Sequence, residues 1–148
     1  MSKELNPMDK FSFLLGTWKM KYKIPKGQFS SEDIGEGKGI FKRILNNRYV
    51  TFDYNAKLTT IEAAAHAIFA WDEKSKIYRY WWFEDSGESM KATCNFINEN
   101  TLCLNWHNSL LVQTFHRAEN GKIILQMKNP SNKNDYDIIL EVVFTKKK

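Results

Sequence analysis

Three histidines are the side chains in this sequence that are best suited to bind a metal or to transfer protons. His66 lies on the predicted outer face of a strand, His107 at a hairpin, and His116 on a predicted inner face near a strand end. None of them has the partner spacing of a metal motif. Cys94 and Cys103 form neither a disulfide framework nor a metal motif. The sequence therefore predicts no metal site and no cofactor, and we interpret the histidines as surface or hydrogen-bonded residues.

Carboxylates and tyrosines offer the remaining chemistry. Asp72 and Asp85 fall in predicted turns, where an aspartate bonds its own backbone. The sequence contains no nucleophile elbow, so it has no catalytic signature. Four tyrosines that are predicted to face inward could still act as acids or hydrogen-bond donors: Tyr22, Tyr54, Tyr78 and Tyr80. They keep open the alternative of an enzyme acting on an enclosed apolar substrate, whereas the main hypothesis is a protein that binds a ligand without covalent chemistry.

The strand that begins at Trp18 fixes which side of the protein is inside. From Trp18 to Ile24, every second residue is a lysine and the residues between them are apolar or aromatic. Such alternation indicates a strand with one face buried and one face in water. A short helix is predicted before it, because Asn6 can cap a helix that starts at Pro7 and Gly16 can end it.

The rest of the chain consists of predicted strands and tight turns. Further alternation predicts strands in 34–45, 50–58, 62–72, 76–84, 90–95, 101–107, 110–117, 122–128 and 136–145. Asn46-Asn47 fits a type I′ hairpin turn, and 118–121 is interpreted as a four-residue turn. Roughly ten antiparallel strands with one apolar face must roll up, because an open sheet would leave two edges exposed.

We therefore predict an all-β fold, an up-and-down antiparallel β-barrel of about ten strands with one short N-terminal helix. A single domain would span residues 1–148. Two sandwiched sheets in meander order are the alternative architecture.

The predicted lumen is the best candidate for a binding site. Glycines and alanines interrupt its aromatic wall, which is typical of an apolar pocket with a few polar hydroxyls. The predicted ligand-binding residues are Trp18, Tyr22, Phe41, Phe52, Tyr54, Phe69, Trp71, Tyr78, Tyr80, Trp82 and Trp106. Large and small residues also alternate where side chains simply fill a barrel, so a packed interior is the competing interpretation.

Composition limits the partners. The net charge is +5, but three of these charges come from Lys146–Lys148 and the rest are spread along strand faces, so no nucleic-acid surface is predicted. Residues 1–10 are polar, and the apolar run that follows is too short for a signal peptide. No stretch approaches the roughly 20 apolar residues of a membrane span. We expect a cytoplasmic protein with no membrane partner.

The predicted outer faces of the last three strands are unusually apolar. They carry Leu111, Phe115, Ile124, Ile139 and Val143. A barrel has no second layer to cover such residues, and a contiguous apolar patch usually marks an interface. We therefore predict a homodimer through this surface. A bulge before Leu110 would turn these residues inward and remove the patch.

A family resemblance agrees with the barrel. The residues that carry it are Phe13-Leu14-Leu15-Gly16-Thr17-Trp18, Trp71-Asp72 and Phe83-Glu84-Asp85-Ser86-Gly87. With a short helix before and a strand meander after them, the chain resembles the lipocalin and fatty-acid-binding barrels of the calycin superfamily. More narrowly, it is similar to a lipocalin-like domain family of unknown function found in bacteria. In lipocalins the tryptophan closes one barrel end against a basic residue of the last strand, a part that only Lys146 or Lys147 could take here.

The same resemblance suggests a haem-binding alternative. Nitrobindins are ten-stranded barrels of this type that hold haem through a histidine on a late strand, so His116 would be the ligand here. This chain has Lys19-Met20-Lys21-Tyr22 where those proteins have a glycine-rich extension. Haem is therefore the lowest-ranked of the three functions.

Overall fold

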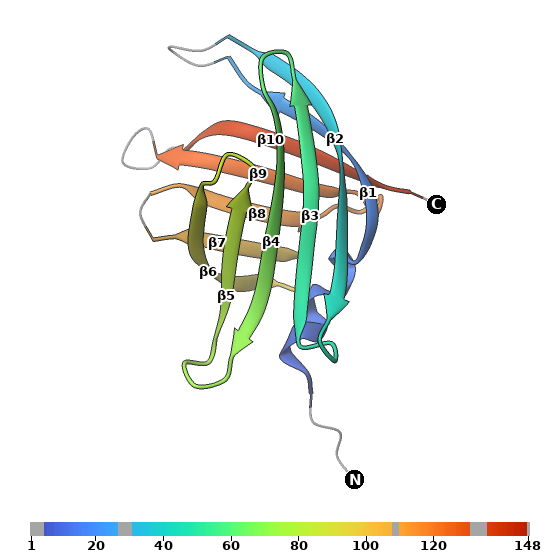
Figure 1. The fold of residues 1–148 in the computed structure, drawn as a ribbon, viewed down its shortest axis with the longest axis vertical. Coiled ribbons are helices and arrows are strands. Elements are labelled where there is room, and N and C mark those ends of the chain that lie inside the picture. The colour runs from blue at the N-terminus through green and yellow to red at the C-terminus, as the bar shows by residue number, and fades with distance from the viewer. Residues whose placement is uncertain (1–4, 27–30, 108–109, 131–135, 148) are drawn as a thin grey trace.

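The computed structural model describes residues 5–26, 31–107, 110–130 and 136–147. A 3-10 helix, η1 (Pro7–Leu14), is followed by ten strands that form a closed barrel (Figure 1). The strands are β1 (Gly16–Ile24), β2 (Asp33–Ile44), β3 (Tyr49–Leu58), β4 (Glu62–Asp72), β5 (Ile77–Glu84), β6 (Ser89–Asn98), β7 (Thr101–Trp106), β8 (Val112–Arg117), β9 (Ile123–Pro130) and β10 (Tyr136–Lys146). The prediction of an all-β, up-and-down antiparallel barrel with one short N-terminal helix is confirmed.

Each strand pairs antiparallel with its neighbours in sequence, and β1 closes the barrel by pairing with β10. Odd-numbered strands therefore end at one rim and even-numbered strands at the other. Helix η1 lies at the rim where the even-numbered strands end, and it contacts β3 and β4 there. The Asn6 side chain there donates to the Asn47 main-chain oxygen at 3.1 Å. One end of the barrel is thus covered by the chain itself.

Alternation in β1 gives the inside that the sequence predicts. Trp18, Met20 and Tyr22 are buried, and the lysines between them are exposed. The turn after β2 also matches the prediction, because Asn46 and Asn47 have φ angles of 58° and 61°. A type I′ turn requires positive φ at both central positions, which asparagine tolerates.

Helix η1 is short and has one strongly apolar side. The Asn6 side chain accepts a hydrogen bond from the Met8 amide at 3.0 Å, and Pro7 fills the first helical position, where no amide proton is needed. Met8, Phe11 and Leu14 are buried. Because these side chains enter the barrel, the helix acts as a plug.

The predicted register of β8 is wrong by one residue. Gln113 and Phe115 face inward, opposite Met127 and Leu125, whereas Val112, Thr114 and His116 were predicted to do so. The cause is the turn between β8 and β9. Ala118 donates to the Lys122 oxygen, and Gly121 has a φ of +81°, so the loop holds three residues rather than four. A change of one residue in loop length moves every side chain of the strand to its other face.

Candidate ligand-binding cavity

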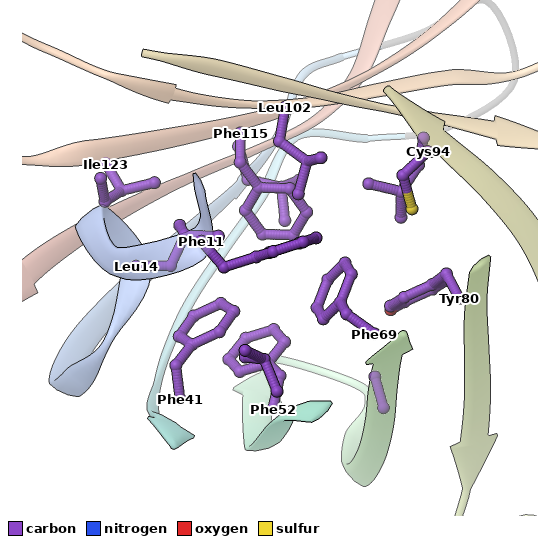
Figure 2. Packing of buried hydrophobic residues seen from close by; sticks show 14 of the residues in the cluster. Phe11, Leu14, Phe41, Phe52, Phe69, Tyr80, Cys94, Leu102, Phe115 and Ile123 are labelled. Carbon is purple, nitrogen blue, oxygen red and sulfur yellow. The ribbon is translucent and has the colours of Figure 1, made fainter. Parts of the chain in front are cut away.

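The end of the barrel beside η1 is densely packed. Phe11 reaches into the barrel, where Figure 2 shows its ring between Phe115 and Phe69. The centroid of the Phe11 ring lies 5.0 Å from that of Phe69 and 5.3 Å from that of Tyr78. The first pair of rings is tilted, and the second meets edge-on. The centroid of the Phe96 ring, on the neighbouring strand β6, lies 5.0 Å from that of Phe11. Such contacts are favourable arrangements for aromatic pairs, so this end is a core.

Trp18 completes the packed end. Its indole Nε1 donates to the Leu14 oxygen at 2.8 Å, which ties the first strand to the end of the helix. The Lys146 ammonium lies 5.3 Å from the ring centroid, within the range of a cation–π contact. The sequence allowed either Lys146 or Lys147 to be the basic residue of the last strand that contacts this tryptophan, and in the structure Lys146 makes the contact.

The other half of the barrel contains a cavity of about 160 Å³. Residues from eight strands and from the segment before β8 line it. Six of the predicted ligand-binding residues are in the wall: Tyr22, Phe52, Tyr54, Tyr80, Trp82 and Trp106. The remaining wall consists of Met20, Met90, Leu111, Gln113, Leu125, Met127, Leu140 and Val142. No residue in this wall carries a charge, so the site is apolar with a few neutral polar groups.

The other five predicted ligand-binding residues do not reach the cavity. Phe41, Phe69, Tyr78 and Trp18 are buried in the hydrophobic core of the barrel, and Trp71 packs against this core. The Tyr78 hydroxyl donates to the Pro7 oxygen at 2.7 Å, and the Trp71 Nε1 donates to Glu73 at 2.6 Å. These five residues do not line this cavity because the helix and the side chains around it occupy their end of the barrel.

Gln113 is a polar cavity residue that the sequence interpretation placed on the outer face, as it did Leu111. Gln113 is 6% exposed and belongs to the wall, but the predicted register placed it outside. The positive-φ glycine at the β8–β9 turn was the signal that could have corrected the register, since Gly is the usual third residue of a three-residue hairpin loop.

Two of the cavity tyrosines are held by hydrogen bonds. Tyr22 donates to the Asn55 oxygen at 2.8 Å, while Tyr54 accepts from the Trp82 Nε1 at 2.7 Å. Burial raises the pKa of both phenols above the ordinary value, and the neighbouring Tyr54 adds to the effect at Tyr22. Both phenols are therefore neutral near pH 7, and the Tyr54 proton is free to be donated.

Three further polar groups of the wall lack a protein partner. Within the described residues, no hydrogen bond is made by the Tyr80 hydroxyl or the Gln113 carboxamide, and the Trp106 Nε1 is buried and unpaired. Burial raises the pKa of Tyr80 far above its ordinary value, with smaller contributions from Tyr54 and Cys94. Buried polar groups are normally hydrogen-bonded, so the Tyr80 hydroxyl and the Gln113 carboxamide are available to a bound molecule, whereas the Trp106 Nε1 has almost no accessible surface.

The histidines lie outside the cavity. His116 is exposed on the outer face of β8, with its Nδ1 2.8 Å from the Thr101 hydroxyl, so its predicted inward position is wrong. It cannot reach a haem inside the barrel. His66 faces outward as predicted and lies 2.5 Å from Asp53, and His107 is exposed. No group of His, Cys, Asp or Glu in the described ranges could hold a metal ion.

The β8 register also changes the predicted dimer surface. Phe115 is fully buried and Leu111 lines the cavity, so their predicted outward positions are wrong. Ile124 and Val143 are half-buried and Ile139 is 38% exposed at a β-bulge in β10. The homodimer stays a prediction, and only these three residues remain as its candidate contacts.

The chain matches no protein-family model and no curated protein sequence. Among solved structures it is similar to "Crystal Structure of Rv2717c from M. tuberculosis", with 10% identity and a TM-score of 0.64 over 98% of this chain and 100% of that chain. It is also similar to a protein from the "De novo design of a fluorescence-activating beta barrel", with 8% identity and a TM-score of 0.45 over 97% and 100% of the chains.

At 10% identity, the first likeness concerns the fold alone. The fold and the site together define a closed ten-stranded β-barrel with an apolar cavity at one end. In the part of the chain that the structure describes, no helix is long and apolar enough to cross a membrane.

Proposed function

We propose that this protein is a lipocalin-like carrier or sensor that binds a small apolar molecule in the cavity between β1, β3 and the β5–β10 wall. The observation that carries the proposal is an uncharged cavity of about 160 Å³ in an otherwise packed barrel. An engineered cavity of about 150 Å³ in another protein binds benzene, so a volume of this order is enough for one ring.

The contrast between the two halves of the barrel supports a role in binding. The cavity is partly open to solvent, and Met90 in its wall is 37% exposed. The opposite half of the same barrel is filled, which shows that this chain can pack such an interior.

Proton-transfer chemistry has less support than binding. Tyr22 and Tyr78 donate to main-chain oxygens, so their protons are already engaged. Burial raises the pKa of Tyr54 and Tyr80, which makes both phenols poorer acids. These properties suit a hydrogen bond to a ligand.

A matched pair of variants tests the proposal. Val142 lines the cavity, and the adjacent Val143 lies on the outer face of the same strand. Val142→Phe should fill the cavity, whereas Val143→Phe adds the same ring outside. Single-ring ligands such as toluene and phenol should raise the melting temperature of the wild type and of Val143→Phe saturably.

The expected effect is measurable. A ligand at 100 times its Kd adds about 2.7 kcal/mol, which corresponds to roughly 5–10 °C for a chain of this length. Val142→Phe should lose the shift. An unchanged melting temperature of the wild type with every ligand, or equal binding by Val142→Phe, would contradict the proposal.

A further inference from the structure

The hydrogen-bonding groups of the cavity are mostly donors. The Tyr54 oxygen already accepts a proton from Trp82, so its own O–H is what it can offer. The Tyr80 O–H and the Gln113 amide have no partner among the described residues, and the same holds for the buried Trp106 Nε1–H. The acceptors among these groups are the Gln113 carbonyl oxygen and the Tyr80 hydroxyl oxygen, since a phenol can both donate and accept. Donors outnumber acceptors, so a ligand that brings an acceptor satisfies more of these groups than a ligand that brings only a donor.

The cavity offers nothing to a charged ligand. Among the described residues that line it, none is Asp, Glu, Lys, Arg or His. Removing a carboxylate or an ammonium from water costs several kcal/mol, even after relaxation, unless an opposite charge compensates. A neutral ligand is therefore favoured, which sets the site apart from one built for a fatty-acid carboxylate.

Size and wall chemistry favour one aromatic ring. The volume of about 160 Å³ suits a single ring with one small substituent. Tyr80 and Trp106 meet edge-on at 5.5 Å, and the Phe52 and Tyr54 rings stack at 4.5 Å, so aromatic faces and edges border the space. Figure 2 shows Tyr80 pointing from β5 into the barrel. Aromatic ligands gain favourable stacked and edge contacts in such surroundings.

We infer that the cavity selects a neutral, single-ring aromatic molecule that carries a hydrogen-bond acceptor such as a ketone or amide oxygen. Tyr80 and Gln113 donate to that acceptor, with Tyr54 on β3 as a further donor. This inference rests on the proposed binding function and narrows it to a chemical class.

Three probes of similar size separate the features of the ligand. Acetophenone has a neutral acceptor, ethylbenzene has none, and benzoate is charged. Binding of each to the full-length protein can be measured at pH 7 by calorimetry or by quenching of tryptophan fluorescence. We expect acetophenone and ethylbenzene to bind and benzoate to bind at least tenfold more weakly than acetophenone.

Variants then test the hydrogen bonds. Tyr80→Phe and Gln113→Leu should each lower the affinity for acetophenone about three- to tenfold, which is the range for the loss of one neutral hydrogen bond. Ethylbenzene should change less than twofold in Tyr80→Phe and should bind Gln113→Leu equally well or better. Val143→Phe serves as the control with unchanged binding of both probes. If one variant fails to fold, the other gives the same comparison.

Infrared spectra report the hydrogen bond to the ligand carbonyl itself, which a change in protein stability alone would not alter. The carbonyl stretch of bound acetophenone should lie below its value in hexane and should rise in Tyr80→Phe. If neither acetophenone nor ethylbenzene binds, the proposed function fails together with the inference. If ethylbenzene binds but the variants do not discriminate between the probes, or if benzoate binds best, only the inference is overturned.

Discussion

The two halves of this barrel have similar walls and different interiors. Large aromatic residues line both, but the half beside η1 is filled by Phe11, Met8 and Leu14, whereas the other half retains a cavity of about 160 Å³. No segment of the described chain enters that second half. The difference shows that strand pattern sets the wall of a barrel, while the segment outside the sheet decides which part of the lumen is available.

Removing the plug should have the largest effect on this contrast. Phe11→Ala deletes a fully buried ring that meets three other rings, so the free energy of unfolding should fall by about 3–5 kcal/mol. Urea unfolding would measure it. Phe83→Ala is the control, because that ring is 45% exposed and should cost less than about 1 kcal/mol. Similar losses in both variants would contradict the description of the helix as a plug.

A pair of identical substitutions compares the two halves directly. Leu102 is fully buried among the packed residues, and Leu125 is in the cavity wall. Leu102→Ala should cost about 2–5 kcal/mol, since it opens a new void. Leu125→Ala should cost less, because part of its side chain already borders empty space. An equal or greater cost for Leu125→Ala in urea unfolding would mean that the cavity half is as tightly packed as the other.

A smaller effect is expected where β1, β2 and β3 meet. A Cβ atom on Gly39 would lie 2.7 Å from the Phe52 ring and 2.8 Å from the Met20 sulfur. Gly39→Ala should therefore destabilise the barrel by about 1–3 kcal/mol through overpacking. Both contacted residues line the cavity, so ligand affinity should fall as well. A variant with unchanged stability and affinity would show that this wall yields more easily than the distances indicate.

The cavity tyrosines should produce the smallest difference, and only at alkaline pH. Burial raises the pKa of Tyr54 and Tyr80 above the value of an unfolded tyrosine, near 10. The folded state thus keeps protons that the unfolded state loses. The associated stability is fully present below pH 10 and is lost as the pH rises through the folded pKa values.

The measurement is the free energy of unfolding from pH 7 to pH 11.5. We expect the contribution of these two tyrosines to the free energy of unfolding to be constant up to about pH 9.5 and to fall at higher pH. Tyr80→Phe should make the fall shallower. An identical alkaline slope in the wild type and the variant would contradict the burial of the Tyr80 hydroxyl.

Much of the fold was predictable because local signals agree. The alternation after Trp18 and the asparagine pair before β3 fix an inner face and a register without any knowledge of distant contacts. The register of β8 was not predictable from alternation, because Val112 and Phe115 place apolar groups on both of its faces. A three-residue turn ending at Gly121 decided the outcome.

The site was predictable only in part for a different reason. Phe69 and Tyr80 are both aromatic residues at inward positions of alternating strands, so the sequence does not distinguish them. In the structure the centroid of the Phe69 ring lies 5.0 Å from that of Phe11 in the helix plug, whereas Tyr80 lines the cavity. How far a plug penetrates depends on packing between segments that are distant in the sequence. Periodicity, which reports only the face of each strand, contains no such information.

A crystal structure under xenon pressure would show directly whether one half of the barrel holds an apolar cavity while the half beside η1 is filled. Xenon enters preformed apolar cavities and needs no specific hydrogen bond. We predict a single interior xenon site, bordered by Tyr54, Tyr80 and Leu125, and no site around Phe11. An interior without xenon, with side chains filling the space between β1 and β9, would contradict the account, and so would a xenon atom in the half beside η1.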